Sequence, residues 1–374
     1  MTGTDNFEIF LAVSPGLEPV LCAELEEKGF PTPSPEAGGV TIRGSWPDVW
    51  RANLDIRGAS RVLARIDSFR VVHLSQLDKS ARRVDWKRVL RPGVPVRVEA
   101  SCRRSKIYHA GAATERVAKA IEAVVGAPVT DDAAVCIRVR IDDNLCTLSV
   151  DTSGDLLHRR GFKAEVNKAP MRETLAALFL REVRYDGTEP VVDPMCGSGT
   201  FVIEAAEIAS GLAPGRARSF AFEQLASFDA KAWDAMRSKR PTGVMSGPKP
   251  VFLGSDRDAG AVRMSRTNAD RAGVGAVTRF EVMPVSDLQR PDTEAGLVIV
   301  NPPYGARIGN KKALYTVYGA LGDTLRARFS GWRVGLLTTD PALARATRLP
   351  FGRPGRPVDH GGLKIRLYKT DHLR

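Results

Sequence analysis

From about residue 165 onward, apolar runs rich in β-branched residues alternate with helical stretches, and this alternation constrains the fold more than any other feature. The predicted strands are PVVDP (190–194), VFLGSD (251–256), RFEVMPV (279–285), AGLVIV (295–300), VGLLTT (334–339) and LKIRLYKT (363–370). The predicted helices lie near 171–184, 199–210, 259–271 and 311–328. Such alternation predicts an α/β fold, a mostly parallel sheet with helices on both faces. Ligands of such a fold bind beyond the carboxyl ends of its strands.

The first half of the chain predicts an α+β region instead. Strand patterns occur at 7–13, 40–44, 61–66, 94–100, 135–141 and 145–151, and helical patterns run from Ser14 or Pro15 to about Lys28, at 75–90 and at 111–125. Asp142-Asp143-Asn144 predicts a hairpin turn between the last two strands. In the second half, the connection 211–250 is long, and its stretch FAFEQLASFDAKAWDAM is predicted to be an inserted helix.

A length of 374 residues predicts two or three domains, each with its own core. The five cysteines lie far apart in the sequence, so neither a zinc motif nor a disulfide framework is predicted. The N-terminus lacks the pattern of a secretory leader, and no apolar run approaches the ~20 residues of a membrane-spanning helix. We therefore expect a cytoplasmic monomer with no membrane segment and no metal.

The net charge of +12 is distributed unevenly along the chain. Residues 51–119 hold 17 basic and 6 acidic side chains, and residues 326–374 hold 11 basic and 3 acidic ones. Concentrated positive charge is typical of proteins that bind a polyanion such as RNA. A basic surface without any such partner would have the same composition, so charge alone leaves both interpretations open.

A glycine-containing octapeptide, Asp193-Pro194-Met195-Cys196-Gly197-Ser198-Gly199-Thr200, lies between a predicted strand and a predicted helix. Glycines let the backbone approach a ligand closely, and the helix N-terminus offers unpaired amides. The dinucleotide pattern G-x-G-x-x-G is not completed, because Val202 occupies the third glycine position, and no P-loop G-K-[ST] follows. The octapeptide therefore predicts either a ligand-binding turn of another kind or a structural turn.

Two further segments follow predicted strands. Asp256, followed by Arg257, can accept hydrogen bonds from ribose hydroxyls or can cap the next helix. Asn301-Pro302-Pro303-Tyr304 contains two prolines, which donate no backbone hydrogen bond and leave carbonyls free as acceptors. The Asn301 side-chain oxygen and the Pro302 carbonyl could hold the two hydrogens of an amino group, while Tyr304 offers a face for stacking a base. A proline-rich structural turn is the alternative.

Taken together, these motifs resemble those of class I S-adenosylmethionine (SAM)-dependent methyltransferases with a THUMP domain, specifically the RlmL-type 23S rRNA guanine-N2 methyltransferases. DPMCGSGT resembles their cofactor loop, NPPYGARIG their catalytic loop, HRRGFKAEVNKAPMRETLAA their entry segment and CRRSKIYHAGAATERV their THUMP signature. The resemblance implies a ferredoxin-like part at 1–50, an RNA-binding THUMP domain at 51–157 and a Rossmann-like methyltransferase domain at 158–374. Some members carry a second methyltransferase domain, which does not follow Arg374 here.

The resemblance also implies roles for individual residues. Catalysis is expected at Asn301, Pro302, Pro303 and Tyr304. SAM is expected to contact Pro170, Met171, Thr174, Asp193, Cys196, Gly197, Ser198, Gly199, Thr200, Asp256, Arg257 and Asp287. Cys196 is expected to be structural rather than a nucleophile, because it lies in the cofactor loop.

The expected partner is RNA, either 23S rRNA or its precursor. The predicted RNA-binding residues are Arg82, Arg83, Lys87, Arg88, Arg103, Arg104, Lys106 and Tyr108, whose cations would hold phosphates without specifying sequence. Three alternatives remain open: a THUMP-type tRNA guanine-N2 methyltransferase, an adenine-N6 or amide methyltransferase, and an RNA-binding or chaperone protein with a vestigial methyltransferase fold.

Overall fold

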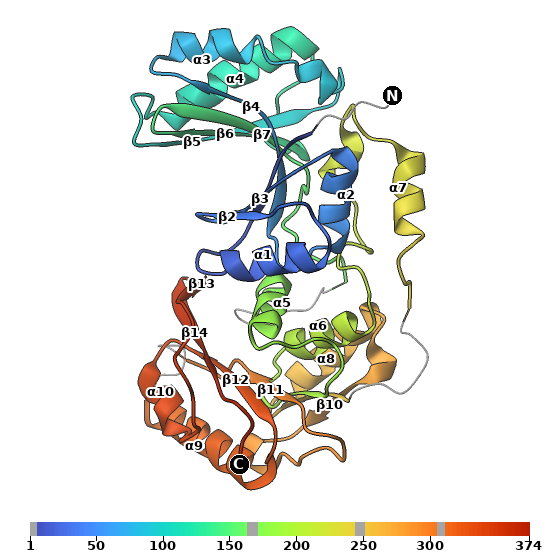
Figure 1. The fold of residues 1–374 in the computed structure, drawn as a ribbon, viewed down its shortest axis with the longest axis vertical. Helices are drawn as coiled ribbons and strands as arrows, with labels where there is room; N and C mark the ends of the chain where they lie inside the picture. Colours follow the sequence, from blue (N-terminus) through green and yellow to red (C-terminus); the bar gives the residue numbers. More distant parts are fainter. Residues whose placement is uncertain (1–5, 163–170, 244–250, 305–310) are drawn as a thin grey trace. The chain divides into compact units, whose positions relative to one another are not determined.

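The computed structural model describes residues 6–162, 171–243, 251–304 and 311–374, which pack into two compact units (Figure 1). The first unit contains the described residues up to Val13, Leu21–Leu157 and Arg218–Lys239. The second contains Ser14–Val20, His158–Ala217 and the described residues of Arg240–Arg374. Among the described helices, none combines the length and the apolar composition that a membrane-spanning helix requires.

The second unit is built on a seven-stranded sheet in the order β10-β9-β8-β11-β12-β14-β13. Its strands are β8 (Val191–Asp193), β9 (Phe252–Asp256), β10 (Thr278–Val282), β11 (Leu297–Val300), β12 (Arg333–Thr338), β13 (Val358–His360) and β14 (Leu363–Lys369). The first five run parallel, and β14 is antiparallel to both of its neighbours. The strand order reverses between β8 and β11, which is where open α/β sheets bind ligands. The predicted α/β fold is confirmed.

Helices cover both faces of this sheet, as Figure 1 shows. On one face lie α5 (Glu173–Glu182), α6 (Thr200–Ala209) and α8 (Ala259–Arg271), and on the other lie α9 (Lys311–Arg328) and α10 (Pro341–Ala346). Asp258 and Asp340 cap α8 and α10 by accepting backbone amide hydrogens, which sets where these helices begin. The short 3-10 turns η3 (Gly275–Val277) and η4 (Val285–Asp287) flank β10. The predicted strand 279–285 therefore ends early, at Val282, before Pro284.

The first unit also has a seven-stranded sheet, in the order β2-β3-β1-β4-β7-β6-β5. Its strands are β1 (Phe7–Ala12), β2 (Ser34–Glu36), β3 (Gly39–Gly44), β4 (Arg61–Arg70), β5 (Val96–Arg103), β6 (Val135–Asp142) and β7 (Leu145–Asp151). Its helices are most of α1 (Glu18–Glu27), α2 (Trp46–Asp55), α3 (Leu74–Ala81), the 3-10 turn η1 (Trp86–Arg88) and α4 (Ala110–Val125). The predicted turn at Asp142–Asn144 is confirmed: Asp143 and Asn144 have φ of 51° and 61°.

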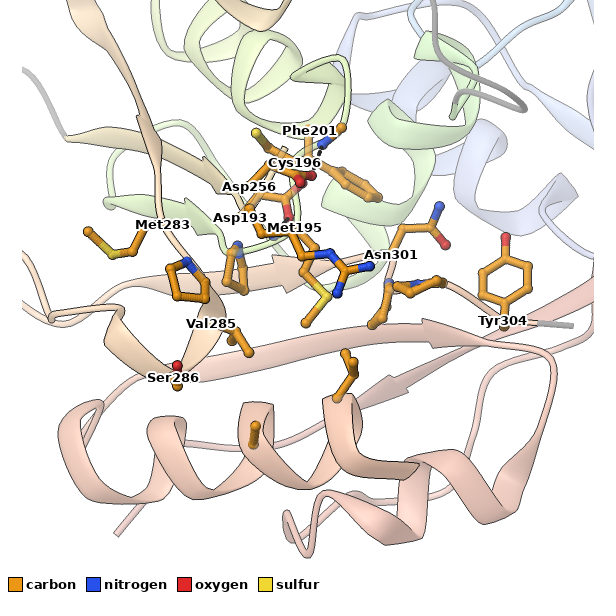
Figure 2. A pocket seen from close by; sticks show the side chains of 18 of the residues that line it. Asp193, Met195, Cys196, Phe201, Asp256, Met283, Val285, Ser286, Asn301 and Tyr304 are labelled. Atoms are coloured by element: carbon orange, nitrogen blue, oxygen red, sulfur yellow. Dashed lines mark hydrogen bonds between the residues drawn. The ribbon is translucent and has the colours of Figure 1, made fainter. Parts of the chain in front are cut away.

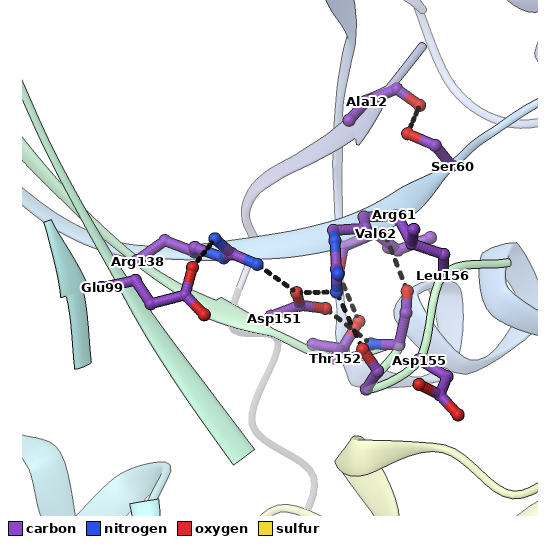
Figure 3. A network of polar contacts seen from close by, with 12 residues as sticks. Ala12, Ser60, Arg61, Val62, Glu99, Arg138, Asp151, Thr152, Asp155 and Leu156 are labelled. Atoms are coloured by element: carbon purple, nitrogen blue, oxygen red, sulfur yellow. Dashed lines mark hydrogen bonds and ion pairs between the residues drawn. The ribbon is translucent and has the colours of Figure 1, made fainter. Parts of the chain in front are cut away.

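Strand β4 joins the two parts of this sheet. It pairs with β1 through Arg61–Ala64 and with β7 along most of its length. The register with β7 shifts between Arg65 and Asp67, so Ile66 forms a bulge. Near the start of β4, the fully buried Asp151 of β7 pairs with Arg61 and, at 3.4 Å, with Arg138 (Figure 3). Two guanidiniums thus compensate one buried carboxylate.

The predicted insertion returns to the first unit rather than packing with the sheet that flanks it in sequence. Its Phe222 stacks on Trp50 of α2, with ring centroids 6.1 Å apart. Arg218 donates hydrogen bonds to the carbonyls of Ser153 and Leu156, at 3.0 and 2.9 Å. The expected single helix is wrong: η2 (Ala221–Gln224) and α7 (Ala230–Arg237) are separate, because Asp229 caps a new helix.

Candidate active site

The second unit contains a cavity of about 800 Å³ at the carboxyl ends of β8, β9 and β11 (Figure 2). That volume is typical of a site for a small organic ligand. The cavity is lined by Met171, Asp193, Pro194, Met195, Cys196, Gly197, Ser198, Thr200, Phe201, Asp256, Arg257, Met283, Pro284, Val285, Ser286, Asn301, Pro302, Pro303, Tyr304, Ala313, Thr316, Val317 and Ala320. It therefore brings the three motifs singled out in the sequence into one site.

The glycine loop has a bent conformation and packs closely against Ser265 of α8. Gly197 and Gly199 have φ of 55° and 81°, a region that disfavours residues with a Cβ atom. A Cβ on Gly199 would lie 3.0 Å from the Cβ of Ser265 on α8. Ser265 in turn donates a hydrogen bond of 2.8 Å to the Gly197 carbonyl. Gly199 thus shapes the loop by close packing, although it does not line the cavity.

Two carboxylates stand at the ends of neighbouring strands. Asp193 ends β8 and is 2% exposed, and burial raises its pKa to about 8 despite a hydrogen bond from the Met195 amide. Asp256 ends β9 and accepts hydrogen bonds from the amides of Gly197, at 3.1 Å, and Asp258, at 3.0 Å. Asp256 does not cap helix α8. That role belongs to Asp258, whose Oδ1 accepts a hydrogen bond from the Gly260 amide at 2.8 Å. Asp256 is therefore available to a ligand in the cavity.

The tetrapeptide Asn301–Tyr304 follows β11 directly. The Asn301 Oδ1 atom is buried, and no group in the described ranges donates a hydrogen bond to it. A buried acceptor of this kind costs about 1–3 kcal/mol unless a donor reaches it. In the view of Figure 2, Asn301 lies between Tyr304 and the group formed by Asp193 and Asp256. The cavity therefore offers an acceptor to a donor-bearing ligand beside the cofactor loop.

Tyr304 is less accessible than the sequence suggested, because only 7% of it is exposed. Its hydroxyl lies close enough to that of Tyr318 on α9 to contribute to raising the Tyr318 pKa, after the larger effect of burial. Tyr318 itself donates to the Thr338 hydroxyl at the end of β12, at 3.2 Å. Tyr304 thus packs beside a hydroxyl pair that connects α9 to the sheet, and its role as a stacking face stays a prediction.

Cys196 has the properties of a structural thiol. Burial raises its pKa well above the usual range, and Asp193 raises it further. Its sulfur lies 3.7 Å from the Ser265 hydroxyl. A protonated, buried thiol is a poor nucleophile.

Most of the predicted cofactor residues line the cavity, but several do not. Thr174, Gly199 and Asp287 are absent from its lining, and Pro170 lies outside the described residues. Asp287 is exposed and accepts a hydrogen bond from the Ser286 hydroxyl instead. Ser286 lines the cavity in its place.

The wall formed by α9 was not predicted from the sequence. The side chains of Ala313, Thr316, Val317 and Ala320 line the cavity at intervals of three and four residues, which is one face of a helix. The sequence does contain a signal that could have predicted this wall, namely small side chains on one face of the helix that follows NPPY. Met195, Phe201, Met283 and Val285 were missed as well, because apolar lining residues are indistinguishable from core in a sequence.

The predicted RNA-binding residues are all exposed and belong to the first unit. They form two groups: Arg82, Arg83, Lys87 and Arg88 follow α3 or lie in η1, whereas Arg103, Arg104, Lys106 and Tyr108 lie between the last residue of β5 and the start of α4. Arg82 pairs with Asp78 and Arg104 with Asp142. Across the described ranges, Arg83, Lys87, Arg103 and Lys106 have no ion pair, and Tyr108 is 84% exposed. These ranges hold no group of three or more metal-ligating side chains placed to bind an ion.

Three family profiles match the chain in the order of its structural parts. An RlmL ferredoxin-like domain matches residues 8–63, a THUMP domain matches 72–151, and an RMKL-like methyltransferase domain matches 160–355. The last profile contains every strand of the second sheet up to β12 and the candidate cavity.

Individual relatives agree with these profiles. The chain is 39% identical to the ribosomal RNA large subunit methyltransferase K/L of Syntrophotalea carbinolica, over 97% of this chain and 53% of that protein. It therefore spans about half the length of the K/L relatives it matches. A Synechocystis sp. protein, provisionally named an RNA methyltransferase, is 31% identical over 97% of this chain and 96% of its own length. A crystal structure solved with SAH, also provisionally named a methyltransferase, superposes with a TM-score of 0.88, covers 100% of both chains and is 26% identical.

Proposed function

Because this chain belongs to the RMKL-like methyltransferase family, we propose that it transfers the methyl group of SAM to the N2 amine of a guanosine in 23S rRNA. The observation that carries the proposal is the buried Asn301 Oδ1, an acceptor without a donor that shares a cavity with Asp193 and Asp256. An exocyclic base amine has two hydrogens to donate, so it suits that acceptor.

The cavity fits SAM by its size and by the chemistry of its walls. Asp193 and Asp256 stand at the two strand ends where an amino group and ribose hydroxyls need acceptors. The bent glycine loop lets backbone atoms approach a ligand where a Cβ would interfere. The related structure solved with SAH has the same fold over its full length. When bound, SAM supplies an electrophilic methyl group.

The residues of the tetrapeptide orient the acceptor of that methyl group. Asn301 Oδ1 and the Pro302 carbonyl hold the two amine hydrogens, which aims the nitrogen at the cofactor loop. Both oxygens also stabilise the positive charge that develops on the nitrogen as the new bond forms. Holding both reactants in line supplies much of the rate enhancement. The side chain of Tyr304 lies beside this position and limits how the base can tilt.

Features of the first unit support the proposal that RNA is the substrate. Its THUMP match covers both groups of exposed cations, and the K/L relatives are named for rRNA of the large subunit. A paired guanosine has to leave its stack to reach a cavity of this kind, at a cost of a few kcal/mol. Transfer to tRNA remains the second candidate, because the described residues that hold an amine would be the same.

Transfer of labelled methyl from SAM to total RNA tests the proposal. The rRNA and tRNA fractions are separated and digested to nucleosides, and we expect label in N2-methylguanosine of large-subunit rRNA. Label in tRNA would replace the substrate and keep the chemistry. Label as N6-methyladenosine, or only in protein, would overturn the assignment of guanine N2.

A further inference from the structure

A second cavity, of about 640 Å³, lies within the first unit, far in sequence from the candidate active site. One wall is the bulge of β4, where Arg65, Ile66 and Asp67 turn away from a regular ladder. β-bulges re-aim side chains and recur beside binding sites. Phe7 of β1 and Trp46 of α2 form a second wall, and the segment from Arg83 to Val89 forms a third. Three walls, built from four separate parts of the chain, thus enclose one hollow.

The tryptophan in the aromatic wall is more exposed than the other four tryptophans of the chain. Trp50, Trp86, Trp233 and Trp332 are at most 3% exposed, whereas Trp46 is half-buried and lines the cavity. Its ring contacts that of Phe7, with centroids 5.0 Å apart and planes tilted by 54°. Half-exposed aromatic rings in a hollow are suited to stacking a planar ligand such as a nucleobase.

The charged groups around the cavity include both signs. Arg83 is exposed and has no ion pair in the described ranges, so it is available to a phosphate. Arg65 is already engaged by Glu8 and Glu36, at 2.9 and 2.8 Å. Asp67 and Asp85 are exposed carboxylates that can accept hydrogen bonds from the amino or imino groups of a base. Arg88 completes the lining. A nucleotide has the flat ring, the donors and the anion that these groups require.

We propose that this cavity binds one unpaired nucleotide of the RNA, with its base against Trp46 and its phosphate at Arg83. The inference rests on the proposal that RNA is the substrate. It adds a contact made by residues that lie far in the protein sequence from those of the candidate active site. Stacking requires an unstacked base, so the site distinguishes single-stranded RNA from a closed duplex. The volume lies within the range of small-molecule sites and accommodates one nucleotide rather than a helix.

Fluorescence of the full chain tests the proposal. The probes are a mixed-sequence single-stranded RNA of ten nucleotides, a blunt RNA duplex of ten base pairs, and free GMP and AMP. The single strand is expected to quench tryptophan emission, and Trp46→Phe is expected to abolish that quenching. Arg83→Gln should weaken binding of the single strand about tenfold and leave the duplex within twofold. Arg83 is exposed and forms no ion pair with any described residue, so this substitution breaks none of the ion pairs that the structure describes.

Lys231→Gln on α7 is the matched control, because it removes one exposed cation from the same unit away from the cavity. It is expected to leave binding of both RNAs within twofold. Equal losses for both RNAs in Arg83→Gln, or quenching that survives Trp46→Phe, would overturn the proposal. So would tight quenching by GMP or AMP alone, since the ligand would then be a free nucleotide. Methyl transfer to rRNA by wild-type protein, measured in parallel, reports separately on the proposed function.

Discussion

At the scale of single residues, Asn301 matters most because its side-chain oxygen is buried without a donor. Asn301→Ala removes the acceptor and, among the described residues, no hydrogen bond of the loop, so we expect methyl transfer to fall by about 10²-fold, the effect of losing one preorganised polar contact. Calorimetry with SAM is the control, and the dissociation constant should stay within threefold of wild type. A variant that turns over near the wild-type rate would contradict the role of Asn301 in holding the amine.

Asp193 makes stability depend on pH in an unusual direction for a carboxylate. Its pKa is about 8 in the folded chain and about 3.9 when unfolded, so the folded state binds the proton more tightly. Between these values stability falls as pH rises, by at most about 1.4 kcal/mol per pH unit, and the loss is complete above pH 8. We expect Asp193→Asn to flatten the fall in unfolding temperature of the ligand-free protein between pH 6 and 8. Scanning calorimetry of both proteins measures this, and identical pH profiles would show that Asp193 is already ionised at pH 6.

At the scale of elements, a glycine at each end of α6 makes it possible to distinguish two effects of a substitution. One effect is crowding in the cofactor loop, and the other is backbone strain. Gly199, at the N-terminal end, and Gly211, just past the C-terminal end, have φ of 81° and 65°. A Cβ would lie 3.0 Å from the Ser265 Cβ at the first site, whereas at the second it would lie 3.8 Å from Pro241, an ordinary van der Waals contact. In both alanine variants, the left-handed conformation lowers stability by about 1 kcal/mol.

We therefore expect Gly199→Ala to destabilise the protein by about 1–3 kcal/mol more than Gly211→Ala, because only the first crowds α8. Gly199→Ala should also weaken SAM binding, since the loop has to shift, whereas Gly211→Ala should not. Denaturant unfolding and calorimetry measure the two effects. Equal losses in both variants would mean that strain alone accounts for the glycine at 199.

Most elements of the second unit could be predicted because they carry a local signal, whereas the short α10 and β13 were not predicted. Its strands are short, β-branched and bounded by turns, and apolar periodicity marked the helices. Helix α2 was not predicted, although Ser45 and Asp48 form a capping box; Pro47 lies in its first turn, where proline is tolerated. The predicted helix 75–90 was too long: α3 ends at Ala81, and Trp86–Arg88 form only a 3-10 turn.

The site could be predicted in part for the same physical reason. Carboxylates, glycines and prolines after strands restrict the chemistry at specific positions, so Asp193, Asp256 and Asn301 were identified and lie in one cavity. Asp287 was carried over from the resemblance rather than argued from its surroundings, and its carboxylate faces solvent outside the cavity. Side chains that shape the cavity by packing alone, such as Val317, carry no local signal.

At the scale of the whole molecule, the sequence does not reveal which unit the insertion joins. Residues Arg218–Lys239 interrupt the second unit in sequence and pack in the first. Three aromatic residues, Phe220, Phe222 and Trp233, pack with one another there. An aromatic run predicts burial, but its partner, Trp50, lies about 170 residues away in sequence, and only the folded chain identifies it.

The positive charge is also divided between the units. In the second, Arg356 and Lys364 flank β13, are exposed and have no ion pair in the described ranges. Strand β14 pairs antiparallel with β12, and Arg366 lies opposite Thr338, the last residue of β12. Lys364 therefore lies past the end of β12, at the sheet edge where β11 leads into Asn301. Phosphates next to the target nucleotide are expected at this edge.

Arg356→Gln combined with Lys364→Gln should thus weaken RNA binding and reduce the slope of log K against log salt by about 1.5, because each phosphate contact contributes about 0.7–0.9. The KM for RNA should rise severalfold, while SAM affinity stays unchanged. Arg184→Gln combined with Arg271→Gln is the matched control: Arg184 precedes β8 and Arg271 ends α8, so both lie toward the opposite edge of the sheet. If the control pair lowered the salt slope as much as the test pair, RNA binding would depend on net charge alone. The sheet edge beside Asn301 would then not be a specific phosphate-binding surface.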